Sequence, residues 1–183
     1  MKDITEDQAI ELLKKYSNSE ESFKIVLEHS KAVQKVALEI AKDVKKNHDI
    51  DFNIIKIGSI LHDIGRFECY KKNKIRHGVV GGEILRKEDL PQYAKIAEKH
   101  VGVGITKKDI EKQGLDLPLK DFVPETKEEK IVTYADNLIF GSRIGTIQEV
   151  VERYRKDLGE DYAERIKKSH NEIEKLRSKN NFL

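Results

Sequence analysis

The feature that most constrains the fold is the spacing of apolar residues, which follows a helical period. Between residues 20 and 47, apolar side chains recur at intervals of three or four positions. This spacing places them on one side of an α-helix, whereas a half-buried strand would alternate at every second residue. We therefore predict one long amphipathic helix over 20–47. Its apolar stripe consists of Val26, Val33, Val36, Ala37, Ile40 and Val44.

Helix-start signals divide the rest of the chain in the same way. A threonine followed three residues later by Gln, Asp or Glu occurs at Thr5, Thr106 and Thr126, and this pattern is typical of a capping box. No strand pair, internal repeat or low-complexity linker is expected, so the sequence predicts an all-α fold. Further helices are predicted over about 5–16, 52–64, 77–90, 91–100, 126–140, 146–157 and 159–180. A short helix is also predicted to begin at 106.

Composition limits the classes of function. The chain has 183 residues, a length suited to one domain, with 35 Lys and Arg against 33 Asp and Glu. This balance gives no reason to expect a nucleic-acid partner, and any attraction for phosphate must be local. No run reaches the roughly 20 apolar residues needed to span a membrane. Cys69 is the only cysteine, which excludes an intramolecular disulfide and favours a cytoplasmic location.

The stretch His62-Asp63-Ile64-Gly65 contains two adjacent side chains able to bind a metal. It follows a predicted buried helix, and Gly65 stands where a helix-ending glycine is expected. His62 and Asp63 point about 100° apart on an ideal helix, so they are able to approach one ion from two directions. A plain His-Asp pair at the surface remains the alternative for these two residues taken alone.

Four more residues share this pattern of polar side chains at helix ends or on apolar faces. His29 lies on the apolar stripe of the long helix, His77 and His100 stand beside glycines at helix ends, and Asp136 interrupts an apolar helix face. A buried carboxylate needs a partner. Hydrogen bonding to backbone or to a basic residue is the alternative explanation for each. Imidazole and carboxylate together favour Mn, Fe, Co, Ni, Zn or Mg, and the lack of nearby cysteine argues against a thiolate zinc site.

The order His29, His62-Asp63, Asp136 resembles the H…HD…D signature of the HD-domain metal-dependent phosphohydrolases. The tetrapeptide at 62–65 is identical to the HDIG variant of that motif. The resemblance covers about 23–143 and points to a small archaeal-type member. It implies a single HD domain over 1–183, a helical bundle in which the N-terminal helix and the C-terminal helices at 146–180 are accessory.

His77 and His100 resemble the additional ligands of two-metal HD enzymes, which include cyclic-dinucleotide phosphodiesterases and symmetrical diadenosine tetraphosphate hydrolases. In that pattern Asp63 bridges two ions. One ion is completed by His29, His62 and Asp136, and the other by His77 and His100. The Gly-Tyr-Pro motif of the cyclic-dinucleotide enzymes does not follow His100, and Val101 replaces their second histidine. These departures argue against cyclic-dinucleotide cleavage and leave one or two ions as alternatives.

The predicted function is hydrolysis of a nucleotide or related small phosphoester by metal-activated water, which Asp63 would also orient. Arg66 directly follows the motif, and its planar guanidinium suits a phosphate. Arg143 lies two predicted helical turns after Asp136 and is a second candidate for substrate binding. The main alternative is a degenerate HD fold that binds nucleotides without turnover. A helical nuclease is disfavoured by the balanced charge, and the sequence leaves homo-oligomerisation open.

Overall fold

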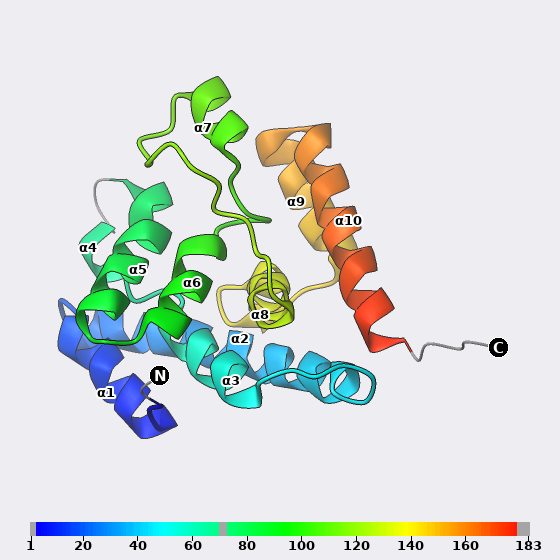
Figure 1. Ribbon diagram of the computed structural model, residues 1–183. Coiled ribbons are helices and arrows are strands. Elements are labelled where there is room, and N and C mark those ends of the chain that lie inside the picture. Colours follow the sequence, from blue (N-terminus) through cyan, green and yellow to red (C-terminus); the bar gives the residue numbers. More distant parts are fainter. Residues whose placement is uncertain (1–2, 70–72, 179–183) are drawn as a thin grey trace.

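The computed structural model describes residues 3–69 and 73–178. Within these ranges the longest helix is α2 (Glu20–Val44), which lies against α3 (Phe52–Leu61) and α8 (Lys127–Asn137). Figure 1 shows α2 and α3 along one side of the molecule, with α8 viewed nearly end-on above them. The predicted long helix is therefore present and occupies the centre of the packing.

Three helices and two short connecting elements complete the side of the molecule that holds the N-terminus (Figure 1). Helices α5 (His77–Lys87) and α6 (Pro91–Lys99) pack side by side, and Pro91 occupies a first-turn position where its missing N–H costs nothing. Helix α1 (Glu6–Tyr16) packs on α2 and α3. The short α4 (Arg66–Cys69) and the 3₁₀ turn η1 (Lys74–Arg76) lie between α3 and α5.

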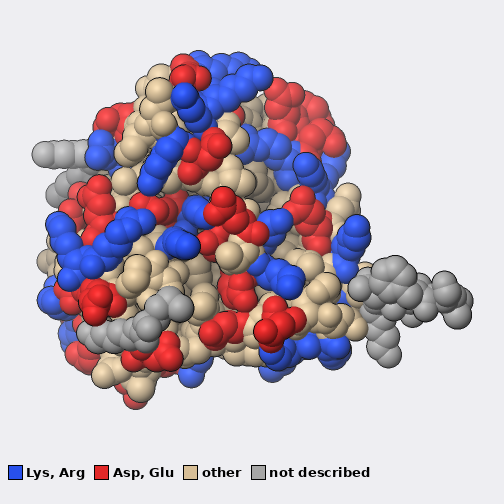
Figure 2. All heavy atoms as spheres, viewed as in Figure 1, with Lys and Arg blue, Asp and Glu red and all other residues tan. Residues whose placement is uncertain are grey.

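The C-terminal part forms a second pair of helices. Helix α9 (Ile147–Leu158) packs against α10 (Glu160–Arg177), and α10 also contacts α8 and α2. Helix α7 (Lys107–Gln113) projects at the other end of the molecule in Figure 1. On the face shown in Figure 2, basic and acidic side chains alternate, with neither sign forming one continuous field.

Two apolar clusters meet on α2 and α3. The first joins α1 to α5 and α6, with Leu13 and Leu61 fully buried; the second joins α2 to α8 and α10, with Ile55 and Ile131 fully buried. Every residue of the predicted stripe on α2 is buried, which confirms the helical period as the signal of the core. The all-α fold class is confirmed. None of the helices in the described part of the chain is long and apolar enough to cross a bilayer.

The predicted absence of paired strands is wrong at one place. The helix expected to run to Phe140 ends at Asn137, and a small antiparallel pair follows, β1 (Ile139–Phe140) with β2 (Arg143–Ile144). The loop is Gly141-Ser142, and Gly141 has a φ of 71°, which an L side chain rarely adopts. Glycine followed by serine between apolar residues is a hairpin signal that the helical interpretation overlooked.

The last two helices bury only part of their apolar residues. Ile166 and Ile173 are buried, but Leu158 is 50% exposed because it is the final residue of α9. His170 on α10 is half-buried and pairs its Nδ1 with the hydroxyl of Tyr134 at 2.7 Å.

Candidate metal centre

Six side chains predicted as metal ligands converge from five segments of the chain. Most stand at helix ends, where the backbone turns and brings the side chain inward. His29 lies within α2, His62 and Asp63 directly follow α3, and His77 begins α5. His100 caps the end of α6, and Asp136 precedes the last residue of α8.

Each of the four histidines is held by a backbone carbonyl at its Nδ1. Since a carbonyl only accepts, Nδ1 carries a proton, so the neutral form of each imidazole has its lone pair on Nε2, the form that binds a metal. The four bonds are His29 to Gly141 O (3.0 Å), His62 to Ser59 O (2.7 Å), His77 to Lys74 O (2.5 Å) and His100 to Ala97 O (2.8 Å).

The four Nε2 atoms surround the carboxylate of Asp63, two on each oxygen. The Nε2 atoms of His29 and His62 both lie 3.4 Å from Oδ2, and those of His77 and His100 both lie 3.3 Å from Oδ1. Asp136 joins the first pair, with Oδ1 2.9 Å from His29 Nε2 and 3.6 Å from His62 Nε2. We call His29, His62 and Asp136 the Oδ2 group, and His77 and His100 the Oδ1 group.

Several of these atoms are buried without a hydrogen-bond partner. Among the described residues, His62 Nε2 and both oxygens of Asp63 receive no hydrogen bond, and each such buried polar atom costs about 1–3 kcal/mol. The Nε2 atoms of His77 and His100 face each other at 2.9 Å. Two nitrogens bound at right angles to one ion would lie about 3 Å apart, given bonds near 2.0–2.1 Å. This donor set therefore fits divalent metal ions.

Burial and the surrounding charges shift the pKa values of His62 and His100 in opposite directions. Burial favours the neutral form of His62, but the carboxylates of Asp63 and Asp136 outweigh it and raise the pKa of His62 to about 10. Burial lowers the pKa of His100 to about 4, with the charges of His62 and His77 acting in the same direction. Although burial would raise the pKa of Asp63, the charges of His62 and Arg66 hold it well below its usual range.

Glycines allow these segments to approach closely. Gly65, expected as a helix-ending glycine, lies four residues after the end of α3 and is not among the residues with positive φ. A Cβ on Gly65 would instead lie 2.1 Å from the carbonyl oxygen of His77. At Gly78 it would lie 2.8 Å from the carbonyl oxygen of Ala97, which accepts the bond from His100. Close approach of the backbones is the role that this geometry supports for both glycines.

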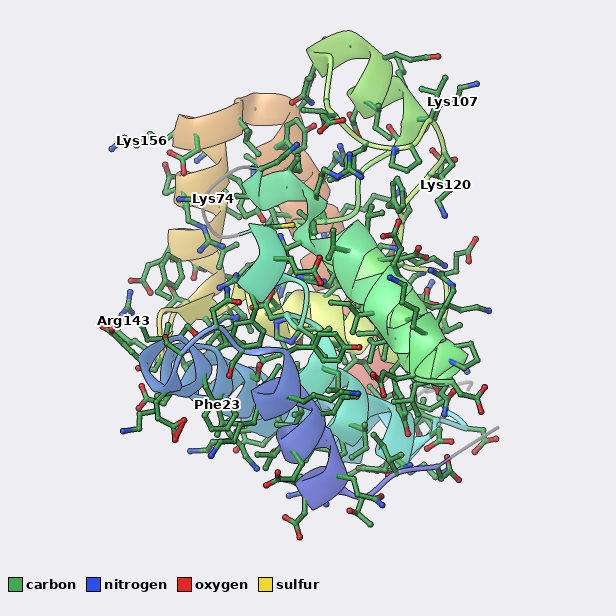
Figure 3. The ribbon with its side chains drawn as sticks, turned by 90° about the vertical axis from the view of Figure 1, so that its left-hand side faces the viewer. Phe23, Lys74, Lys107, Lys120, Arg143 and Lys156 are labelled. Carbon is green, nitrogen blue, oxygen red and sulfur yellow. The ribbon has the colours of Figure 1, made fainter. Side chains whose placement is uncertain are left out.

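The two arginines predicted to bind substrate lie in different surroundings. Arg66 places Nε 2.8 Å from Asp63 Oδ2, with its side chain 41% exposed. Arg143 does not share a helix with Asp136, so the helical-face argument for it is wrong: it belongs to β2, is 58% exposed and pairs with Glu149 at 2.9 Å. Figure 3 shows Arg143 at the edge of the molecule, between α9 and α2.

The carbonyls that hold the histidines could not be predicted from residue types. Ser59, Lys74 and Ala97 each lie three residues before the histidine they bind, as a helical turn requires, but any residue type supplies a carbonyl. Gly141 binds His29 from 112 residues away, through the hairpin that the helical interpretation missed.

Comparison with known families agrees with this geometry. The HD domain model matches residues 26–141, which include all six side chains. The protein belongs to the HD domain family. An uncharacterized protein of Methanocaldococcus jannaschii is 45% identical over 139 residues, 75% of this chain and 79% of that relative.

Two other archaeal relatives are longer than this chain. Proteins named tRNA (cytidine(56)-2′-O)-methyltransferase from Picrophilus torridus and Thermoplasma volcanium are 39% and 43% identical over 93% and 90% of this HD protein. The matched region makes up 47% and 45% of those proteins. The chain thus spans about half the length of these two relatives.

Solved structures share the fold. The HD domain of the L. monocytogenes phosphodiesterase PgpH superposes with a TM-score of 0.54 at 17% identity, covering 92% of this chain and 96% of that one. The same domain in complex with cyclic-di-AMP gives a TM-score of 0.53 at 18% identity. At this identity the likeness establishes an HD-type helical bundle.

Proposed function

We propose that this HD protein hydrolyses a nucleotide or a related small phosphoester or phosphoanhydride with the help of one or two bound divalent metal ions. The observation that carries the proposal is the buried carboxylate of Asp63, with two inward-facing imidazole nitrogens at each oxygen. Such a donor set is costly to maintain in a helical core unless cations complete it. The membership of the HD family supports the same chemistry.

We assign a separate role to each residue from its position in the site. His29, His62 and Asp136 would hold one ion, His77 and His100 the other, and Asp63 would bridge them. Bound divalent ions supply neutralisation of phosphate charge and a lower pKa of water at the site. The Nδ1 bonds keep each imidazole in the metal-binding tautomer, Asp63 orients the attacking water, and Arg66 presents its guanidinium to a phosphate oxygen.

A metal analysis followed by a substrate screen tests the proposal. Purified protein would be analysed for bound metal, stripped, and assayed with Mn, Co, Ni or Mg against nucleotides, dinucleotides and simple phosphoesters. We expect metal-dependent release of phosphate or a nucleoside monophosphate that a chelator abolishes. Protein that binds metal stoichiometrically yet hydrolyses none of these compounds would contradict hydrolysis.

A second candidate is a regulatory HD module that binds a nucleotide without turnover. Its support is the pair of relatives in which a region like this chain makes up about half of a protein named for tRNA methyl transfer. In that case we expect saturable nucleotide binding with no product over hours. Turnover that disappears in an Asp63→Asn variant would exclude this candidate.

A further inference from the structure

Asn137 connects the metal centre to α9. It directly follows Asp136, and its side-chain amide donates to the carbonyls of Thr133 and Gly102, the second residue after His100. Its Oδ1 accepts a 2.6 Å bond from the Tyr154 hydroxyl, and its backbone carbonyl accepts a 3.1 Å bond from Arg153 Nη2. Arg153 is therefore fixed one residue away from a predicted metal ligand.

The guanidinium groups of Arg153 and Arg143 both lie over the ring of Phe140. The guanidinium carbon of Arg153 lies 4.4 Å from the centre of the Phe140 ring, and that of Arg143 lies 5.1 Å from it. Phe140 precedes Gly141, whose carbonyl holds His29. The pair of arginines is thus attached to the Oδ2 group through the hairpin and through Asn137.

The two arginines differ in their counter-charges. Arg143 makes two hydrogen bonds to Glu149, at 2.9 and 3.3 Å, in an exposed position. Arg153 is partly buried, and no carboxylate in the described part of the chain lies within ion-pair distance of it. Glu149, one helical turn before Arg153, is already held by Arg143. Arg153 therefore has a positive charge and most of its N–H donors available, next to the backbone of the residue that follows Asp136.

We propose that Arg153 binds a phosphate of the substrate beyond the one that is hydrolysed, so that the substrate carries a chain of at least two phosphates. This inference rests on the proposed function. A partly desolvated guanidinium without a carboxylate favours an anion, and its planar fork matches phosphate oxygens. Stacking on Phe140 restricts the side chain before the substrate arrives, which lowers the entropy lost on binding.

The position relative to Arg66 supports a second phosphate. Arg66 lies against Asp63, after the end of α3, whereas Arg153 comes from α9 and binds the backbone carbonyl of the residue after Asp136. Two cationic side chains attached to different ligand-bearing elements suit a substrate whose charge extends past a single phosphate. A nucleoside triphosphate or a dinucleoside polyphosphate has this chemistry.

An Arg153→Gln variant tests the inference with two substrates. With a nucleoside triphosphate we expect KM to rise about 10–100-fold, the value of one or two charge-assisted hydrogen bonds, while kcat changes little. With bis(p-nitrophenyl) phosphate, which has one phosphate, we expect KM unchanged. Arg153→Lys should restore part of the affinity. Equal changes with both substrates, or no change with either, would overturn the inference.

Arg155→Gln is the matched control. Arg155 lies two residues further along α9 but pairs with Glu152 and Glu160 at the exposed surface. It should leave both KM values unchanged, and the thermal unfolding midpoints of all variants should be compared to exclude misfolding.

A binding measurement separates this inference from the proposed function. A fluorescent, non-hydrolysable nucleoside triphosphate analogue and the corresponding monophosphate would be titrated into Mg²⁺-loaded protein. Arg153→Gln should weaken binding of the triphosphate and leave the monophosphate unaffected. If triphosphate binding weakens in this way but the wild-type protein hydrolyses no substrate, hydrolysis would be refuted and the phosphate site would be supported. If the protein hydrolyses substrate but Arg153→Gln binds the triphosphate as tightly as the wild type, only the phosphate site would be refuted.

Discussion

The Oδ2 and Oδ1 groups surround the same carboxylate, that of Asp63, but their residues come from different parts of the chain. His29 and Asp136 of the Oδ2 group are 107 residues apart and come from α2 and α8, whereas His77 and His100 are 23 residues apart and come from the neighbouring helices α5 and α6. The Oδ2 group contains a second carboxylate and the Oδ1 group contains none. We infer that an ion at the Oδ2 group is bound more tightly, because a dication gains more from a buried anion than from neutral imidazoles.

The largest effect is expected at the residue that both groups share. Asp63→Asn keeps the shape of the side chain but removes the charge that would bridge two ions. We expect metal binding to be lost and the hydrolysis rate to fall by at least about 10³-fold, because phosphate charge is no longer neutralised. Steady-state kinetics with saturating metal measure this. Asp116→Asn, an exposed residue paired with Arg76, is the control and should keep full activity.

The next effect distinguishes the groups from each other. His62→Ala removes a ligand from the tighter group, and we expect it to bind less than about one equivalent of metal and to lose at least about 10²-fold in rate. His77→Ala removes a ligand from the weaker group, so it should retain about one equivalent and a slower but measurable rate.

Metal titration with calorimetry, in parallel with kinetics, makes this comparison. Equal stoichiometry and equal rates in the two variants would show that the groups are equivalent. His48→Ala, in the loop after α2, is a histidine control away from the centre and should match the wild type.

Residue chemistry and helical spacing, together with the resemblance to the HD family, predicted the six side chains that the structure brings together. The stripe on α2 identified both the core and the inward position of His29, and Asp136 was recognised because a carboxylate interrupts an apolar face. The assignment of all six side chains as ligands stays a prediction. Helical spacing placed Arg143 on the same face as Asp136, but the hairpin signal of Gly141-Ser142, which was overlooked, moves Arg143 onto β2.

Arg153 was missed for a different physical reason. On α9 it is one cation among several in a charged helix, and nothing in the sequence separates it from Arg155. The two residues differ only in their packing. Arg153 contacts the Phe140 ring and the Asn137 carbonyl, whereas Arg155 pairs with two glutamates at the surface. Long-range packing of this kind is not encoded in local periodicity.

A smaller effect is expected from the backbone junction that sets the distance between the groups. Gly65→Ala would place Cβ 2.1 Å from the His77 carbonyl and 2.5 Å from the Gly81 nitrogen, both backbone atoms that cannot move aside. We expect the free energy of unfolding to fall by about 1–3 kcal/mol, measured by urea denaturation.

Gly58→Ala is the matched control, on α3. Its Cβ would meet the end of the Ile96 side chain at 2.3 Å, a group able to change rotamer, and alanine adds about 1 kcal/mol of helix propensity. A larger loss of stability for Gly58→Ala than for Gly65→Ala would contradict the close-approach role of Gly65.

The smallest effect is expected at Arg66, which contacts only the Oδ2 side of the shared carboxylate. Arg66→Gln removes a positive charge 2.8 Å from Asp63, so metal affinity should stay the same or increase, because the ion no longer competes with a guanidinium. KM for the substrate should rise about 10-fold, equivalent to about 1.4 kcal/mol, if the other guanidinium nitrogens bind phosphate. Arg76→Gln, in the nearby 3₁₀ turn, controls for a general loss of basic charge. Metal affinity that falls in Arg66→Gln with KM unchanged would instead assign Arg66 to the positioning of Asp63, and the Oδ2 group would then depend on a cation for its geometry.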